Sequence, residues 1–167
     1  AVVSCGREPA EQTRARIAQT GALERAVFDE LNAARADPET YSKRLHSRRP
    51  FYDGTVLNLP GRTPVSTKEG AAALDEAAEV LADAEPMPQL QWSPALNSAA
   101  RDHGRDIGQR GLITHQGSDG SMPLDRVRRY APSVTSIGEC ISFGANDPES
   151  VVADLIVDDG VADRGHR

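Results

Sequence analysis

A histidine and two acids lie close together near the C-terminal end of this sequence. His166 follows Asp158 and Asp159 within the segment LIVDDGVADRGHR, which spans residues 155–167. Carboxylate oxygen and imidazole nitrogen are both ligands of zinc, and a carboxylate beside an imidazole also supports acid–base chemistry. The local spacing leaves a second interpretation open, in which the two acids only cap and solvate the end of a helix.

Two more residues of the same chemical types stand where function is favoured. His115 lies in GLITHQGSDGS, after a glycine that ends a helix and before small polar residues that form a tight loop. Glu139 in SIGECISFG lies between a glycine and a short apolar segment, where an acid is often directed into a cavity. Ser118 and Ser121 are interpreted as turn residues of the loop and not as nucleophiles.

The remaining histidines and the two cysteines do not indicate nucleophilic catalysis. His46 lies in the basic stretch RLHSRRP and is expected at the surface, whereas His103 is expected to be a hydrogen-bonded packing residue on the apolar face of a helix. Neither Cys5 nor Cys140 has a histidine nearby in the sequence, and GxSxG, Walker and GxGxxG motifs are absent from it.

Length, composition and charge limit the classes of protein to consider. A chain of 167 residues with 38% hydrophobic and 26% charged residues suits one globular domain with a hydrophobic core. No apolar run approaches the length needed to cross a bilayer. The formal net charge of -6 disfavours binding to nucleic acid or to anionic lipid.

The N-terminal 20 residues are polar and lack apolar periodicity. We expect them to form a tether or a loosely docked extension before a domain over residues 21–167. The opening AVVSCG is similar to the lipobox of a bacterial lipoprotein, in which Cys5 would be the membrane tether. Two alternatives stay open: a remnant of an ordinary signal-peptide cleavage site, and an unstructured start.

Periodicity and capping residues predict four helical regions, of which the first two are separated by an irregular stretch. Apolar residues recur at helical spacing over residues 22–45, and Pro38 should interrupt that helix. Residues 47–70 are rich in proline and glycine and predict a loop with a short strand.

The second helix is the alanine-rich stretch AAALDEAAEVLADAE, which should end at Pro86. Ser66 or Thr67 can cap its start, and Glu69 is placed to answer as the acid of a capping box.

The third and fourth helices carry clear start and stop signals. Ser93 caps one helix that Gly111 ends, and Asp147 caps another that Gly160 ends. The best strand-like run in the chain is ECISFG, residues 139–144.

Five segments, taken together and in this order, resemble the CAP superfamily of cysteine-rich secretory, antigen-five and pathogenesis-related proteins. They are LERAVFDELNAARADPETYSKRL, LQWSPALNSAARDHGRDIG, THQGSDGS, GECISFG and DDGVADRGHR. The resemblance extends from about Leu23 to Arg167 and is greatest to the bacterial, SCP-like branch.

The resemblance implies an α/β fold, an α-β-α sandwich that is helix-rich in this chain. Family members continue after the Arg-Gly-His-Arg segment into strands of the central sheet. The domain over residues 21–167 is therefore expected to be incomplete at its C-terminal end, with the strands after Arg167 supplied by another fragment or chain.

The resemblance also implies a cleft lined by two histidines and two acids, which in some members binds zinc or another divalent cation. Carried onto this sequence, the histidines are His115 and His166, the expected metal ligands, and the first acid is Glu139. Family spacing favours Asp158 as the second acid. Helical geometry favours Asp159, because steps of about 100° per residue place it nearer the centre of the apolar face.

Three interpretations of that cleft follow. The favoured one is a secreted or cell-envelope binding module for a small molecule, a lipid or a peptide, outside the cytoplasm. The second is a metal-assisted peptidase or esterase, in which Glu139 or an aspartate polarises water. The third is a polar network that only orders the cleft.

The sequence departs from the family pattern beside Glu139. The family's Gly-Glu-Asn is Gly138-Glu139-Cys140 here, which replaces an amide by a thiol that hydrogen-bonds weakly.

Overall fold

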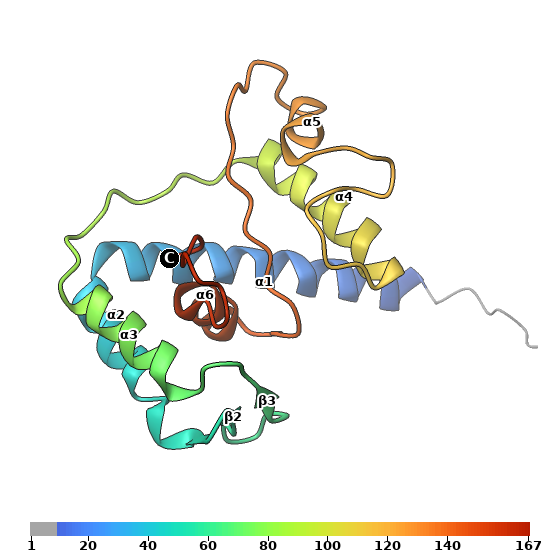
Figure 1. The fold of residues 1–167 in the computed structure, drawn as a ribbon. Coiled ribbons are helices and arrows are strands. Elements are labelled where there is room, and N and C mark those ends of the chain that lie inside the picture. Colours follow the sequence, from blue (N-terminus) through green and yellow to red (C-terminus); the bar gives the residue numbers. More distant parts are fainter. Residues whose placement is uncertain (1–9) are drawn as a thin grey trace, which may run out of the picture. The chain divides into compact units, whose positions relative to one another are not determined.

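The structure is a computed structural model that describes the backbone of residues 10–167 and side chains from Thr20 onward (Figure 1). Cys5 lies outside the described residues. The chain divides into two compact units: a terminal unit, Ala1–Gln89 with Ser142–Arg167, and a middle unit, Leu90–Ile141. The described helices and one small antiparallel sheet confirm the expected helix-rich α/β class.

The first predicted helix is two helices in the structure, α1 (Ala10–Ala36) and α2 (Pro38–His46). The interruption at Pro38 is confirmed, because proline disfavours helical geometry in the residue before it. Asp37 then caps α2 by accepting a hydrogen bond from the Thr40 amide at 3.0 Å. Helix α1 begins at Ala10 rather than near Gly21. Residues 10–20 are mainly Ala, Glu, Gln and Arg, which favour helix, and contain no glycine or proline.

The irregular stretch after α2 forms a small sheet where one short strand was expected. Its elements are the 3-10 helix η1 (Arg49–Phe51) and the strands β1 (Tyr52–Asp53), β2 (Val56–Leu57) and β3 (Val65–Ser66). The strands pair antiparallel in the order β1-β2-β3, with Tyr52 opposite Leu57 and Val56 opposite Ser66.

Helix α3 (Ala71–Ala82) begins differently from the prediction. Its N-cap is Gly70, whose φ of 65° and close approach to the carbonyl oxygen of Gly54 both require a residue without a side chain. Ser66 lies in β3, and Glu69 does not form the expected capping box, because its carboxylate binds Gly160 and Arg164. The helix also ends before Pro86, at Ala82.

Helix α6 (Pro148–Val157) has the predicted start but a different end. Asp147 caps it by accepting a hydrogen bond from the Ser150 amide at 2.9 Å. The terminator is Asp158, which takes the left-handed conformation with φ 53°, and not Gly160. Aspartate tolerates this conformation better than most residues.

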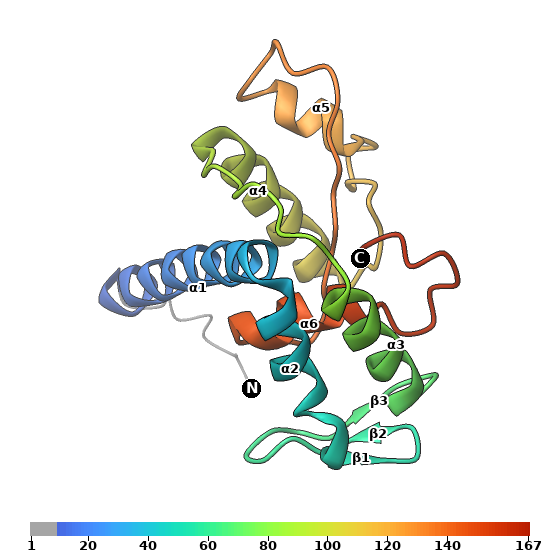
Figure 2. The same cartoon turned by 90° about the vertical axis from the view of Figure 1, so that its left-hand side faces the viewer.

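The core of the terminal unit lies among its helices. Helix α2 packs against α3, and α1 packs against α6, an arrangement seen in both views (Figures 1 and 2). Small residues on α3 let its neighbours approach closely, while Leu45 and Leu74 fill the space between them at 2% and 1% exposure. The buried cluster comprises Ala34, Tyr41, Leu45, Ala73, Leu74, Ala77, Val152, Ala153, Ile156 and Val157.

The middle unit is built on α4 (Pro94–Arg110) and the short α5 (Pro123–Arg128). The predicted caps of α4 are confirmed: the hydroxyl of Ser93 accepts from the Leu96 amide at 3.3 Å, and Gly111 ends the helix in the left-handed conformation. The predicted strand ECISFG is wrong, since residues 139–143 have no regular structure. A strand needs a partner for its backbone groups, and no strand is found in the middle unit, all of which is described.

Candidate functional site

The imidazole of His115 is held by a carboxylate. His115 lies in the loop after α4, and its Nδ1 lies 2.9 Å from Oε1 of Glu139. A carboxylate can only accept, so Nδ1 carries the proton and donates it to Glu139. The neutral ring then has its lone pair on Nε2. The side chain of His115 is 47% exposed.

Arg126 neutralises the same carboxylate from the interior of the middle unit. Its side chain is 3% exposed, and Nη2 donates to both oxygens of Glu139, at 2.9 and 2.7 Å. Nη1 donates to the backbone carbonyls of His115 and Ser121, at 3.0 and 2.9 Å. One guanidinium group therefore fixes both the acid and the loop that carries the histidine.

Glu139 is ionised in this environment. Burial raises the pKa of its carboxyl, but the hydrogen bonds from His115 and Arg126 and the charge of Arg126 outweigh that effect and leave the pKa below its usual value. Glu139 is thus an anchored carboxylate with both oxygens already engaged.

His103 packs beneath this group, as expected from the apolar face of α4. The side chain is 4% exposed, and Nε2 lies 3.0 Å from the carbonyl oxygen of Thr114, so it is the protonated nitrogen. The same nitrogen is 3.8 Å from Oε1 of Glu139. Nδ1 is buried without a hydrogen-bond partner. The sequence did not indicate that His103 lies this close to the acid.

The small polar residues after His115 form a loop fixed by two aspartates. Asp106 accepts from the backbone amide and the hydroxyl of Ser118, at 2.7 and 2.5 Å. Asp119 accepts from the Ser121 amide at 3.0 Å and from Arg129 at 2.8 Å. The hydroxyl of Ser118 is therefore engaged by Asp106 in a turn, as its sequence context indicated.

A second histidine–carboxylate pair lies in the terminal unit. Nδ1 of His166 lies 2.7 Å from Oδ1 of Asp158, and the His166 amide donates to Oδ2 at 3.0 Å. Asp158 is 4% exposed and His166 28% exposed. As at His115, the carboxylate selects the tautomer with the proton on Nδ1 and the lone pair on Nε2.

Asp158 is ionised despite its burial. Burial raises the pKa of the carboxyl, but the hydrogen bonds from the His166 amide and ring, together with the charge of Arg164, bring the pKa below its usual value.

Asp159 is hydrogen-bonded to the backbone just before α3 and not to His166. Its carboxylate accepts from the amides of Lys68 and Glu69, at 2.6 and 2.8 Å. Asp159 does not lie on the apolar face of α6, where helical spacing predicted it, because α6 ends at Val157. The left-handed conformation of Asp158 then turns the chain, so that the 100° step no longer applies.

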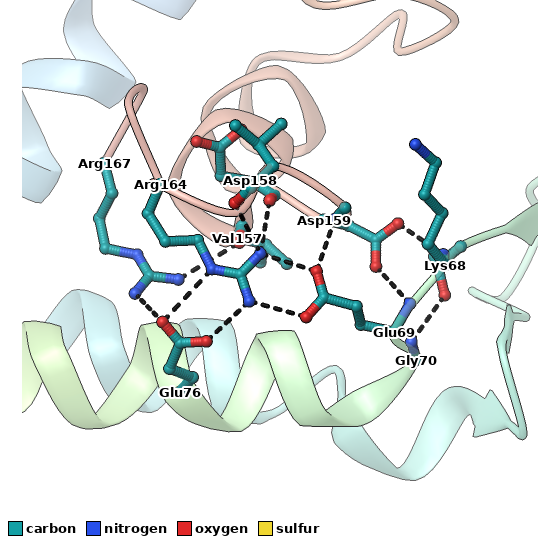
Figure 3. Close-up of polar contacts among 12 residues, drawn as sticks. Lys68, Glu69, Gly70, Glu76, Val157, Asp158, Asp159, Arg164 and Arg167 are labelled. Atoms are coloured by element: carbon teal, nitrogen blue, oxygen red, sulfur yellow. Dashed lines mark hydrogen bonds and ion pairs between the residues drawn. The ribbon is translucent and has the colours of Figure 1, made fainter.

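Two arginines and two glutamates fasten the segment around His166 to α3, and we call these four residues the arginine clamp. Figure 3 shows the guanidinium group of Arg164 between the carboxylates of Glu69 and Glu76. Arg164 bonds both Glu69 oxygens at 2.7 and 2.8 Å and Glu76 Oε2 at 2.8 Å. Arg167 reaches Glu76 Oε1 at 2.8 Å.

We expect the arginine clamp to make the folding stability of the terminal unit sensitive to acid. Hydrogen bonds from the clamp arginines lower the pKa of Glu69 and of Glu76 from 4.5 to about 2. Because the folded pKa values lie below the unfolded ones, the contribution is complete above pH 4.5 and is lost as the pH falls towards 2.

Thermal unfolding of Glu69→Gln and of wild type, followed by circular dichroism, tests the predicted acid sensitivity of the arginine clamp. The stability difference between the two proteins should be constant above pH 6 and shrink below pH 4.5, with Glu79→Gln on the exposed face of α3 as control. A difference that persists unchanged at about pH 2 contradicts the assignment.

The donor chemistry of the two pairs fits a metal ion through the histidines rather than the acids. Histidines that ligate a metal commonly donate their other ring N–H to a carboxylate, as His115 and His166 do. Among the described residues, no three His, Cys, Asp or Glu side chains form a cluster that could hold a metal ion.

Sequence reasoning named the histidines and acids but missed the arginines and glutamates that hold them. Arg164 and Arg167 belong to the Arg-Gly-His-Arg segment, but nothing in the sequence indicates their partners Glu69 and Glu76, and no local pattern shows that Arg126 is buried. Cys140 is exposed, and His46 is an exposed residue 3.6 Å from Asp75, as expected.

Comparison with known proteins identifies one family. The family model of the "CAP: Cysteine-rich secretory protein family" matches residues 28–167, which include both histidine–carboxylate pairs. No curated protein and no solved structure matched the chain. Within the described residues, no helix is long and apolar enough to span a membrane.

Proposed function

Because this chain belongs to the cysteine-rich secretory protein (CAP) family, we propose that it is a binding module whose histidines His115 and His166 bind a divalent cation or a small ligand. The observation that supports this is the shared geometry of the two rings. In each, a carboxylate takes the Nδ1 proton, so that Nε2 carries a lone pair toward a ligand.

Zinc or a similar cation is the group that this donor set suits best. Neutral imidazole nitrogen is a strong zinc ligand, and a bound cation would supply a positive charge able to hold an anionic or carbonyl group of a small molecule, lipid or peptide. Glu139 and Asp158 orient the rings and select their tautomers; they are not themselves proposed as ligands.

Hydrolysis is the second candidate and is disfavoured by the state of Glu139. A general base must be free to accept a proton from water, whereas both oxygens of Glu139 are engaged by Arg126 and its pKa is lowered. The third alternative is a polar network with no ligand at all.

Further features of the proposal rest on the family and on the sequence. We propose an extracytoplasmic location, secreted or at the cell envelope, and membership of the bacterial, SCP-like branch. Cys5 is the residue through which a lipid tether would attach.

Titration calorimetry with zinc tests the binding proposal. Wild type should bind, and His115→Ala and His166→Ala should each weaken the affinity by more than about tenfold, since loss of even an outer-shell partner costs 10–100-fold. His46→Ala, which removes an exposed histidine, is the matched control.

The outcomes separate the alternatives. If wild type does not bind zinc, magnesium or calcium, and the two variants only lose folding stability, the network interpretation replaces the binding module. Ester or peptide hydrolysis above background by zinc-loaded wild type, lost in His115→Ala, would favour the hydrolase. Equal weakening in the double and single variants would indicate that both histidines serve one ion.

A further inference from the structure

We propose that Glu76, on α3, is a positioning residue for His166 and acts through Arg164 and Arg167. The proposal rests on the function proposed above, in which His166 is a ligand-binding histidine. Arg164 lies two residues before His166 and Arg167 directly after it, so the two contacts of Glu76 bracket the imidazole along the chain.

The backbone around His166 is irregular. Residues 158–167 contain no helix or strand, and both Asp158 and Arg164 have positive φ, at 53° and 48°. Residues other than glycine rarely take such conformations unless surrounding contacts impose them. The segment therefore depends on its side-chain contacts for its shape.

Arg164 and Arg167 impose the shape of this segment through hydrogen bonds to its backbone carbonyls. Nη1 of Arg164 donates to the carbonyls of Asp158 and Val161, at 2.9 and 3.2 Å. Nε of Arg167 donates to the carbonyl of Ile156 at 2.9 Å, and Nη2 to that of Val157 at 3.3 Å. These are carbonyls at the end of α6 and in the turn that carries Asp158, the partner of the imidazole.

Glu76 is bonded to both of these arginines. Each of its oxygens is bonded to a clamp arginine, at 2.8 Å to Arg167 and 2.8 Å to Arg164, as Figure 3 shows. Arg164 has a second carboxylate in Glu69, whereas Arg167 has only Glu76 among the described acids. Glu76 is the one carboxylate in the clamp that holds both arginines in place.

Glu76 on α3 therefore influences which tautomer His166 adopts. With Glu76 present, the turn holds Asp158 where it accepts from both the amide and Nδ1 of His166. Without it, the arginines lose their common anchor, and the Asp158–His166 hydrogen bond loses its fixed geometry. The ring then samples the tautomer with the proton on Nε2, which cannot bind a cation through that nitrogen.

The test compares full-length wild type with Glu76→Gln, a change that removes the charge and keeps the shape. Long-range nitrogen–proton NMR correlations of the apoprotein should show His166 as the Nδ1–H tautomer in wild type and as a mixture in Glu76→Gln. In zinc titrations the dissociation constant should rise by roughly 3–10-fold, less than for direct loss of an outer-shell partner. Glu79→Gln, on the exposed side of the same helix, should change neither the His166 tautomer nor the dissociation constant for zinc.

The tautomer readout separates this proposal from the one it rests on. If wild type does not bind zinc but Glu76→Gln alters the His166 signals, the binding proposal fails and the positioning role stands. If the His166 signals are unchanged in a folded Glu76→Gln protein, the positioning role is overturned, whatever the zinc result. Should Glu76→Gln fail to fold, Arg167→Lys provides the same comparison, because it retains the charge and cannot bridge Glu76 to both carbonyls. Unchanged signals in that variant also overturn the proposal.

Discussion

Replacing Arg126 by alanine is expected to destabilise the middle unit by about 3–5 kcal/mol, the cost of breaking a buried ion pair from one side. The Arg126 side chain is 3% exposed, and its removal leaves Glu139 with its charge in a largely buried position. The carbonyls of His115 and Ser121 lose their donor in the same change. The carboxyl of Glu139 should then titrate at a higher pH, because the charge that lowered its pKa is gone.

Urea unfolding followed by tryptophan fluorescence measures this effect in the correct unit, since Trp92 is the only tryptophan in the chain and lies in the middle unit. Arg129→Ala is the matched control. Arg129 caps the end of the same short helix and pairs with Asp119 at the surface, with half of its side chain exposed. Its loss should cost less than about 1 kcal/mol. Equal losses for the two variants would show that the Arg126–Glu139 pair does not hold the unit together.

Replacing Leu74 by alanine should destabilise the terminal unit by about 2–5 kcal/mol. Leu74 is 1% exposed and lies in the buried cluster to which α2, α3 and α6 contribute, next to the small residue Ala73. The loss combines the transfer of the missing methyl and methylene groups to water with the cavity left behind.

Urea unfolding followed by far-ultraviolet circular dichroism gives the measurement. Val80→Ala is a control on the same helix, because Val80 is 48% exposed and its truncation should change stability by no more than about 0.5 kcal/mol. A loss below about 1 kcal/mol for Leu74→Ala would mean that the core relaxes around the gap, and would contradict the close packing of α2 on α3.

Sequence patterns were most informative where the signal and its structural partner are neighbours in the chain. Ser93 and Asp147 were recognised as helix caps because the amide that each one binds lies three residues further on. The break at Pro38 is equally local. In each case the chemistry that sets the boundary is contained within one turn of the helix.

The same reasoning failed where the partner is distant. Glu69 has the spacing of a capping-box acid, yet it binds Gly160 and Arg164, which are more than 90 residues away. Asp159 was placed by extending a regular helix, and a single left-handed residue at Asp158 ended that helix first. Neither outcome could be read from local periodicity, because both depend on which segments meet in the folded chain.

For the candidate site, motif resemblance named the histidines and their acids, and the structure adds what supports them. His115 with Glu139 and His166 with Asp158 are each in hydrogen-bond contact. Arg126 belongs to no motif, and the Arg-Gly-His-Arg segment contains Arg164 and Arg167 without indicating their partners Glu69 and Glu76. A buried arginine looks the same in a sequence as an exposed one, so its role emerges only when burial and partners are known.

The contact between Asp159 and the start of α3 also bears on the order in which the chain can fold. The carboxylate that accepts the Lys68 amide lies 91 residues later in the chain, with the whole middle unit between them. At a synthesis rate of 5–20 residues per second, the first turn of α3 would wait about 5–18 s on the ribosome for this partner. The middle unit, whose residues are continuous in sequence, can collapse during that interval. The contacts of the terminal unit that involve residues 158–167 can thus form only after the middle unit has been made.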